Sequence, residues 1–420
     1  MKSDTNFPCL AIAKRAVRRV MLSSVYLLAV TVARGENTSS AVFQRSDFGS
    51  PQLTKKQEDE VGWKFGYRIP SLLVTKGGTV LAFADRRKVD KGLAVGCKLP
   101  DVGVPTDVSL KRSLDGGKTW QAEQILFPAT DCNYHSAMVV CDEKSGRIYK
   151  FARRFPLKAD NPTSIGEDLD LKQLRADGGG DFCVYSDDEG KSWSVPQFVD
   201  LPYPENARSI GLCNSVHGVQ LRGGRMIILG KYTLPSSKGK MEAYTQLFCS
   251  DDGGGTWKKG FAFKPKGSNL EVVLATVDEH TVLLNHRPPG SAQDAGSSRS
   301  SYLIGNDGEA LVDSSTDCFY AAVCHAGVIS QVTAKTPFPL LLTAANASLT
   351  ANTKRLLRQK LTLMNSRDGG KSWTQEIVLD EGVSGYSDLQ YASDGALLCL
   401  YEAGANSNFV KCLRISGVSK

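Results

Sequence analysis

The sequence predicts an all-β fold, and within that class a six-bladed β-propeller. The first observation is a repeat, because four segments of the chain share the pattern S-x-D-x-G-x-[ST]-W. These segments are SLDGGKTW at Ser113–Trp120, SDDEGKSW at Ser186–Trp193, SDDGGGTW at Ser250–Trp257 and SRDGGKSW at Ser366–Trp373. The second observation is that short strand-like runs flank the copies, such as DFCVY before the second and YTQLF before the third. The third is the lack of long amphipathic helical stretches. A strand–turn–strand unit repeated along a chain is the signature of a propeller blade.

Each copy of the repeat carries the residues of a tight turn. The aspartate caps backbone N–H groups of the loop, the glycine adopts the left-handed conformation, and the tryptophan packs beneath the hairpin. The copies start at residues 113, 186, 250 and 366, so the steps between them are 73, 64 and 116 residues. Because the last step is about twice a blade, we expect one blade without the motif. Roughly 350 residues at about 50–60 residues per blade then give six blades.

The N-terminal residues read as a leader that precedes the blades. The basic cluster KRAVRR is followed by the apolar run VMLSSVYLLAVTVA and by small residues near Ala33. This order is typical of a secretory signal peptide. A signal anchor and an organelle-targeting leader are the alternatives. We therefore expect a leader over residues 1–35, an N-terminal arm over 36–61 and the propeller over 62–416, in a protein of the secretory pathway that is secreted, lysosomal or membrane-anchored.

Composition narrows the classes of function. The chain has 420 residues and a formal charge of +7, but the leader alone carries six basic residues and one acidic residue, which leaves about +2 for the rest. A nucleic-acid binder usually has a strongly basic domain, so this class is not expected. The sequence has no CxxC, HExxH or Walker A motif, which argues against a zinc or nucleotide site. Ten cysteines follow the leader, and their even number permits disulfides, but several lie in apolar runs that favour buried thiols.

One charged residue stands in an apolar strand-like run. Arg68 lies within GYRIPSLL at residues 66–73. An arginine keeps its charge in a protein and is almost never fully buried without a partner. Arg68 therefore either pairs with an internal carboxylate, for which Asp85 is the nearest candidate in the sequence, or lines a cleft and binds an acid from outside.

The repeats resemble the Asp boxes of sialidases, and the resemblance extends over residues 62–412. YRIP at Arg68 resembles the [FY]RIP motif of that family, whose arginine binds the carboxylate of sialic acid. Arg287 in LLNHR resembles the second arginine of the family, and Arg358, eight residues before the fourth box, resembles the third. Arg355 lies nearby and is the alternative for this third arginine. Three guanidinium groups can hold one carboxylate through charge-assisted hydrogen bonds.

The same resemblance implies a nucleophile and a base. GYSDLQY at residues 385–391 resembles the YSDL motif, in which the tyrosine, here Tyr386, attacks the anomeric carbon. Glu271, 16 residues before Arg287, stands where the family places the glutamate that pairs with this tyrosine, although Leu270 replaces a frequent asparagine. Sialidases depart from other glycosidases in using a tyrosine. A neutral phenol is not repelled by the carboxylate of the substrate, whereas an aspartate or glutamate would be.

The general acid/base of the family is an aspartate between the RIP strand and the first box. Asp101 in KLPDVGVPTD is our assignment, Asp90 is the alternative, and Asp107 is expected in the next strand. This residue would protonate the leaving oxygen and then activate water. Asp85 and Arg87 in FADRRK resemble residues that bind the sugar or orient Arg68, and a surface ion pair is the other interpretation.

The resemblance implies an exo-α-sialidase that releases terminal sialic acid from glycoproteins, glycolipids or oligosaccharides. Retention of configuration through a covalent tyrosyl intermediate is expected, with no cofactor, metal or lipid. The expected partners are sialylated glycoconjugates. A trans-sialidase or a hydrolase for a related keto-sugar acid would share the catalytic residues. An inactive sialic-acid-binding propeller is the alternative from a different class, and it would not need the tyrosine, glutamate and aspartate together.

Overall fold

The structure is a computed structural model, and it describes residues 37–44, 65–88, 104–157, 171–213, 216–266, 271–290, 297–315, 318–333, 335–349, 356–404 and 409–417. The predicted leader and the acid/base candidates Asp90 and Asp101 lie outside these ranges. Within them the protein is all-β, as the sequence predicts. The helical elements there are α2 (Leu171–Ala176) and the 3-10 turn η2 (Asn306–Gly308). In this part of the chain no helix has the length and apolar character needed to cross a membrane.

The first sheet holds two successive four-stranded units. Its strands are β2 (Phe65–Val74), β3 (Val80–Lys88), β4 (Thr106–Ser113), β5 (Gln124–Phe127), β6 (Cys132–Cys141), β7 (Ile148–Pro156), β8 (Gly180–Ser186) and β9 (Gln197–Phe198). Strands β2 to β5 form one antiparallel unit and strands β6 to β9 the next. A single parallel pairing, between Thr106 and Asn133, joins the two units.

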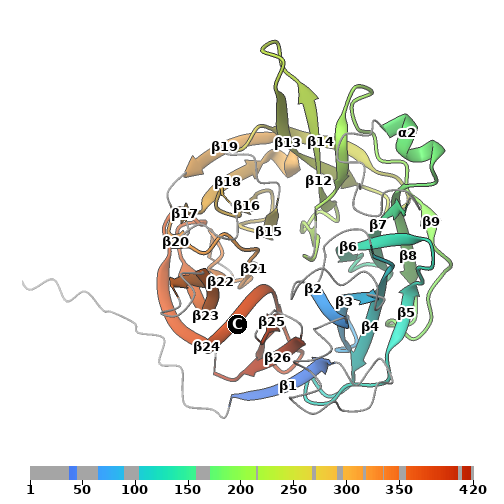
Figure 1. The fold of residues 1–420 in the computed structure, drawn as a ribbon. Helices are drawn as coiled ribbons and strands as arrows, with labels where there is room; N and C mark the ends of the chain where they lie inside the picture. Colours follow the sequence, from blue (N-terminus) through green and yellow to red (C-terminus); the bar gives the residue numbers. More distant parts are fainter. Residues whose placement is uncertain are drawn as a thin grey trace, which may run out of the picture.

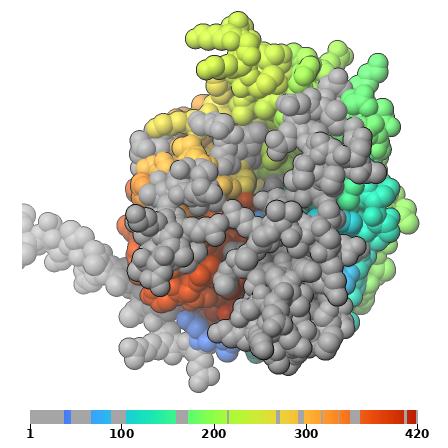
Figure 2. Space-filling view, viewed as in Figure 1, coloured from blue at the N-terminus to red at the C-terminus, as the bar shows by residue number. Residues whose placement is uncertain are grey.

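Two further sheets each form one unit. The strands of the third unit are β10 (Arg208–Leu212), β11 (Val219–Gln220), β12 (Met226–Pro235), β13 (Met241–Ser250) and β14 (Lys258–Phe263). Those of the fourth are β15 (Val272–Thr276), β16 (Val282–His286), β18 (Ser300–Gly305) and β19 (Ala310–Ser315). The short strands β17 (Ser297–Ser298) and β20 (Tyr320–Ala321) pair with each other beside the fourth unit. The hairpin of β12 and β13 projects from the rim of the molecule (Figures 1 and 2).

The last sheet spans two units and includes the N-terminal strand. Its strands are β1 (Thr38–Phe43), β21 (Gly327–Ser330), β22 (Leu340–Leu349), β23 (Leu356–Ser366), β24 (Thr374–Tyr391), β25 (Leu397–Ala403) and β26 (Phe409–Ile415). The long strand β24 pairs with β23 through its first half and with β25 through its second half. Strand β1, from the segment predicted as an N-terminal arm, pairs with β26 as the outer strand of the last unit.

The innermost strands of the units contact one another in a closed circuit. Strand β2 contacts β24 and β6, β6 contacts β11, β11 contacts β15, β15 contacts β21, and β21 contacts β24. Figure 1 shows the units arranged around this inner circuit. The fold is therefore β-propeller-like, and the inner strands are the elements that can present side chains to a common centre.

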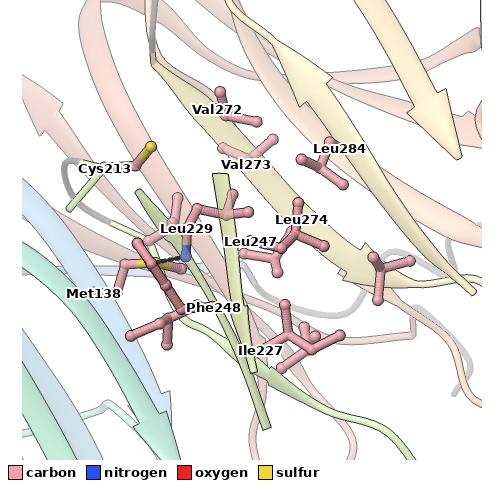
Figure 3. Close-up of a cluster of buried hydrophobic side chains, with 14 of the residues drawn as sticks. Met138, Cys213, Ile227, Leu229, Leu247, Phe248, Val272, Val273, Leu274 and Leu284 are labelled. Atoms are coloured by element: carbon pink, nitrogen blue, oxygen red, sulfur yellow. Dashed lines mark hydrogen bonds between the residues drawn. The ribbon is translucent and has the colours of Figure 1, made fainter. Parts of the chain in front are cut away.

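The hydrophobic core lies between the sheets, because the inner strands are apolar on both faces. All five residues of β16 (VLLNH) and all seven of β25 (LLCLYEA) are buried. A short continuous apolar run of this kind is typical of a strand covered on both sides. Figure 3 shows Met138 of β6 beside Leu229 of β12, whose backbone N–H lies 3.0 Å from the Met138 sulfur. Neighbouring units are thus joined by direct packing of their inner strands.

The turns of the repeat have the predicted geometry. Asp252 accepts hydrogen bonds from the backbone N–H and the hydroxyl of Thr256, at 2.8 and 2.7 Å. The Ser250 hydroxyl donates to Asp252 and accepts from the N–H of Gly254, whose φ is 92°. The corresponding contacts recur around Asp115, Asp188 and Asp368. The aspartate cap and the left-handed glycine are therefore confirmed.

Two units lack the motif, the fourth and the last, whose outer strands β26 and β1 come from distant parts of the chain. The sequence predicts one such unit, and the fourth is the one it locates. The outer hairpin of the fourth unit, between β18 and β19, turns through η2 instead of a copy of the repeat. This unit lies between the third and fourth copies, where the sequence shows the doubled step. The nine cysteines that the structure describes are all free thiols, and those at 183, 249 and 399 are buried, as their apolar surroundings predict.

We expect Asp252→Ala to lower the free energy of unfolding by about 1–2 kcal/mol at pH 7, because two donors of the turn lose their acceptor. Hydrogen bonds from Thr256 lower the pKa of Asp252 to about 2. The carboxylate therefore stabilises the fold above about pH 4, its unfolded pKa, and this contribution is lost as the pH falls through about 2. Urea denaturation measures both effects.

The matched control is Asp251→Ala. It removes the same charge from the neighbouring residue, whose carboxylate forms a solvent-exposed ion pair with Arg225 at 2.6 Å. Such pairs contribute about 0–1 kcal/mol. Equal losses for the two variants would contradict the capping role of Asp252.

Candidate active site

The structure brings together five of the residues that the sequence singles out. Arg68 lies on β2, Glu271 immediately before β15, Arg287 immediately after β16, Arg358 on β23 and Tyr386 on β24. Each of the other four contacts the side chain of Tyr386, two through its oxygen and two over its ring. The cluster is built from four different units, whose strands bring these residues together around Tyr386.

Tyr386, Glu271 and Arg287 form a triangle of hydrogen bonds. The Tyr386 hydroxyl donates to Glu271 Oε1 at 2.5 Å. Arg287 Nη1 donates to the same carboxylate oxygen at 2.5 Å and also lies 3.1 Å from the Tyr386 oxygen. A phenol held this way has a proton acceptor already in place, and a fixed cation beside its oxygen.

The protonation states in this triangle follow from burial and from the charges. Burial alone would raise the pKa of Glu271, but the Arg287 guanidinium and the hydrogen bonds outweigh it and lower that pKa to about 2. Burial, reinforced by the Glu271 charge, raises the pKa of Tyr386 well above its usual value. At neutral pH the resting site therefore holds an ionised Glu271 and a neutral phenol.

Arg68 is held in place by Glu402, a residue that the sequence analysis does not single out. Arg68 Nε donates to Glu402 Oε1 at 3.0 Å, and the carboxylate is fully buried. Glu402 also accepts from the backbone N–H groups of Ile69, at 3.0 Å, and Tyr386, at 3.2 Å. Among the described residues, Glu402 pairs with Arg68, whereas Asp85 pairs with Arg87. One carboxylate fixes both the arginine and the backbone that carries the tyrosine.

The backbone beside Arg68 is strained. Ile69 has a φ of 59°, in the left-handed region that a β-branched residue rarely adopts. The register between β2 and β3 shifts between Arg68 and Ser71, which marks a bulge. Bulges near functional sites redirect a side chain, and residues in such strained conformations cluster there. The bulge explains how an arginine in an otherwise buried strand reaches the central cluster.

Arg358 carries a charge that no protein carboxylate in the described part of the chain balances. Its Nη2 donates to the carbonyl oxygen of Val323 at 2.8 Å, and its guanidinium carbon lies 5.6 Å from the centre of the Tyr386 ring. Arg68 and Arg287 have Glu402 and Glu271 as partners. Among the described residues, three guanidinium groups face two carboxylates around the tyrosine, and this positive excess favours an anionic ligand.

Asp85 and Arg87 form a buried ion pair, so the interpretation of a surface pair is wrong. Their side chains lie 3.5 Å apart and are each 1% exposed. Asp85 also accepts the N–H of Ser136 at 2.8 Å, and burial raises its pKa to about 6. Nearby, the buried Lys150 donates to the hydroxyls of Ser71 and Ser136, both at 2.9 Å. These hydrogen bonds and the ion pair join β2, β3, β6 and β7.

Other polar residues of the site have weak signals in the sequence. Glu402 is a single acid inside the apolar run LLCLYEA, which is the one local indication of a buried carboxylate. Asp388, in the YSDL stretch, accepts from the N–H of Leu72 at 2.8 Å and contacts His217 at 2.9 Å. His325 stands in none of the sequence motifs that mark the other residues of the site. Asp107 lies in β4, as predicted, whereas the acid/base assignment to Asp101 or Asp90 stays a prediction.

Comparisons with known proteins agree with this fold. The sequence profile of the BNR repeat-like domain family matches residues 103–399, and the chain belongs to this family. A sialidase of Micromonospora viridifaciens is 26% identical over 405 residues, which cover 91% of this chain and 57% of that protein. This chain thus spans somewhat under two thirds of the length of that relative. With its relatives among the sialidases, the chain is a member of the sialidase family.

Solved structures of sialidases share the fold. The Hadza microbial sialidase Hz136 superimposes with a TM-score of 0.64 at 21% identity, covering 86% of this chain and 68% of that one. The Trypanosoma rangeli sialidase in complex with 2,3-difluorosialic acid, described as a covalent intermediate, gives a TM-score of 0.62 at 18% identity, covering 91% and 58%.

We expect Glu402→Gln to lower the free energy of unfolding by on the order of 3 kcal/mol, because the variant leaves Arg68 without its buried counter-charge. Denaturation by urea measures this loss. Glu381→Gln is the control, since Glu381 lies 3.8 Å from Lys360 in an exposed pair and its loss should cost less than about 1 kcal/mol. If Glu402→Gln lowers the free energy of unfolding no more than the control does, the pairing of Glu402 with Arg68 does not stabilise the fold.

Proposed function

We propose that the protein is a six-bladed β-propeller exo-α-sialidase that cleaves terminal sialic acid with retention, through a covalent bond to Tyr386. The observation that carries the proposal is the triangle of Tyr386, Glu271 and Arg287 set among three converging arginines. A tyrosine with a carboxylate acceptor is the arrangement that sialidases use in place of paired carboxylates. The six antiparallel units, five of them four-stranded and the third five-stranded, support the propeller together with the circuit of their innermost strands.

The positive excess supports a substrate that brings its own carboxylate. In the proposed complex, the substrate acid lies among Arg68, Arg287 and Arg358 and supplies the anion that Arg358 lacks. Arginine suits this role because its planar fork binds a carboxylate through two parallel hydrogen bonds. Such fixed charges also stabilise an oxocarbenium-like transition state without a cofactor.

The first chemical step forms a bond between the Tyr386 oxygen and the anomeric carbon. The bond from that carbon to the glycosidic oxygen breaks, and the leaving oxygen takes a proton from the general acid, for which Asp101 stays our assignment. The phenolic proton moves to Glu271, along the hydrogen bond of 2.5 Å. The neutral phenol approaches the substrate without the repulsion that a carboxylate nucleophile would meet.

The second step returns the enzyme to its resting state. Water, deprotonated by the same acid/base, attacks the anomeric carbon, the bond to Tyr386 breaks, and Glu271 returns its proton to the phenol. The proposed substrates are sialylated glycoproteins, glycolipids and oligosaccharides, met in the secretory pathway. A sugar hydroxyl in place of water would make the second step a transfer, so an assay with an acceptor sugar separates hydrolase from trans-sialidase.

Tyr386→Phe should reduce hydrolysis of a fluorogenic sialoside at least about 1,000-fold, because phenylalanine keeps the ring but removes the attacking oxygen. Tyr391→Phe, on the same strand but outside the cluster, is the matched control and should retain wild-type activity. Incubation with 2,3-difluorosialic acid followed by peptide mass spectrometry should find the adduct on Tyr386 in the wild type. An active Tyr386→Phe variant, or an adduct on another residue, would disprove the nucleophile.

Arg358→Gln should weaken the binding of a sialic acid analogue by about 10–100-fold while leaving its methyl ester nearly unaffected, since only the free acid carries the charge that Arg358 binds. Isothermal titration calorimetry with both compounds gives the two ratios. Arg367→Gln, an exposed arginine beside the fourth repeat turn, is the control for loss of one positive charge. Equal losses for acid and ester would argue against carboxylate binding by Arg358.

A further inference from the structure

A short segment between β20 and β21, Ala322–His325, packs against residues of the proposed site. The carbonyl oxygen of Val323 accepts from Arg358 at 2.8 Å, and that of Cys324 accepts from the buried Arg299 at 2.9 Å. The N–H of Ala322 donates to Ala345 at 3.0 Å. The side chains of Ala322 and Cys324 also belong to a small buried apolar cluster that includes Tyr386.

His325 ends this segment with its ring stacked against Tyr386. The two ring centres lie 5.2 Å apart and the planes differ by 29°. His325 is 1% exposed. Among the residues that the structure describes, neither of its ring nitrogens has a hydrogen-bond partner. A buried polar group without a partner costs stability, so packing of the core does not by itself account for a histidine here.

The surroundings of His325 favour the neutral imidazole. Burial lowers its pKa to about 4, and this outweighs the opposite effect of the Glu271 charge. Arg299 and Arg287 act in the same direction as burial, whereas Asp388 acts with Glu271. A neutral flat ring can therefore pack against the phenol without adding charge to a site that is already positive.

The contacts around Tyr386 divide into those that hold its oxygen and those that hold its ring. Glu271 and Arg287 hold the oxygen. The guanidinium carbons of Arg68 and Arg358 lie 5.3 and 5.6 Å from the ring centre, and His325 supplies the aromatic contact. If the proposed substrate draws both guanidinium groups toward its carboxylate, the stacking on His325 remains, together with the packing of the apolar cluster that includes Ala322 and Cys324.

We propose that His325 is a positioning residue that holds the Tyr386 phenol at the attack position through the reaction. The inference rests on the proposed function, because it assigns His325 a role only if Tyr386 is the nucleophile. A displacement of about 1 Å at a reacting atom can cost about 100-fold in rate. Loss of the imidazole should therefore slow the chemical step and leave binding of the carboxylate largely intact.

The test is the rate at which 2,3-difluorosialic acid modifies Tyr386, followed by mass spectrometry of the intact protein. In this reaction the Tyr386 oxygen bonds to the anomeric carbon, fluoride leaves with its bonding electrons, and the phenolic proton goes to Glu271. We expect His325→Ala to slow the modification at least about 10-fold and to lower kcat equally, while the affinity for an unreactive 2,3-didehydro analogue of sialic acid changes less than about 3-fold.

Two further variants keep this test decisive. His325→Phe restores a flat ring and should recover most of the lost rate, which a role in stability alone would not produce. Val328→Ala is the control for lost packing, because Val328 is buried on β21 three residues after His325. It should destabilise the core but leave the rate of modification unchanged. If His325→Phe does not fold, the contrast between His325→Ala and Val328→Ala still decides the outcome.

The outcomes separate this inference from the proposed function. If the wild type is modified on Tyr386 and His325→Ala is modified at the same rate, the positioning role of His325 is overturned and the proposed function stands. A parallel loss of analogue binding in His325→Ala would also overturn it, since the whole site would then have collapsed. If the wild type neither hydrolyses sialosides nor forms the adduct, the proposed function fails and the role of His325 falls with it.

Discussion

The candidate site depends on the buried carboxylate of Glu402. This one side chain accepts hydrogen bonds from the Arg68 guanidinium, from the N–H of the strained Ile69 and from the N–H of Tyr386. Burial of an ion is costly unless its lone pairs are satisfied, and here they are satisfied by the groups that the site must hold. The bulge of β2 and the middle of β24 are thereby joined at the atoms that carry the proposed chemistry. The geometry of the arginine cannot change without disturbing the tyrosine.

The charges of the site are arranged in two tiers. Around Tyr386, arginines outnumber carboxylates, and Arg358 has only a backbone carbonyl as its partner in the described part of the chain. Beneath this tier, Asp85, Arg87 and Lys150 form a buried network with serine hydroxyls. In the lower tier Asp85 pairs with Arg87, and Lys150 donates to serine hydroxyls, whereas Arg358 in the upper tier has no carboxylate partner among the described residues. The lower tier can thus act as a rigid support, while the upper tier presents a positive charge to a ligand. The Arg287 guanidinium in the upper tier also keeps the pKa of Glu271 low although Glu271 is buried.

The sequence predicts the repeat turns and the residues around Tyr386 well, because both depend on local patterns. The capped turn needs only eight consecutive residues, and Arg68, Arg287, Arg358, Glu271 and Tyr386 stand in recognisable stretches. Glu402 and His325 could not be predicted, since Glu402 pairs with Arg68, 334 positions away, and His325 stacks on Tyr386, which lies on another strand. The buried state of Asp85 and Arg87 was missed for the same reason: FADRRK looks like the exposed end of a strand. The sequence places strand β1 in an arm because its partner β26 is far away in the chain, with Thr38 opposite Arg414.

The pairing of β1 with β26 has a consequence for the order of folding. Contacts between residues so far apart close a very long loop, and long loops close late and slowly. Strand β1 is synthesised before β26 and can pair with it only after β26 is made. Until then β1 lacks this partner and is prone to pair with other chains. The last unit is therefore complete only when β1 has paired with β26, and β26 in turn pairs with β25, the strand that carries Glu402.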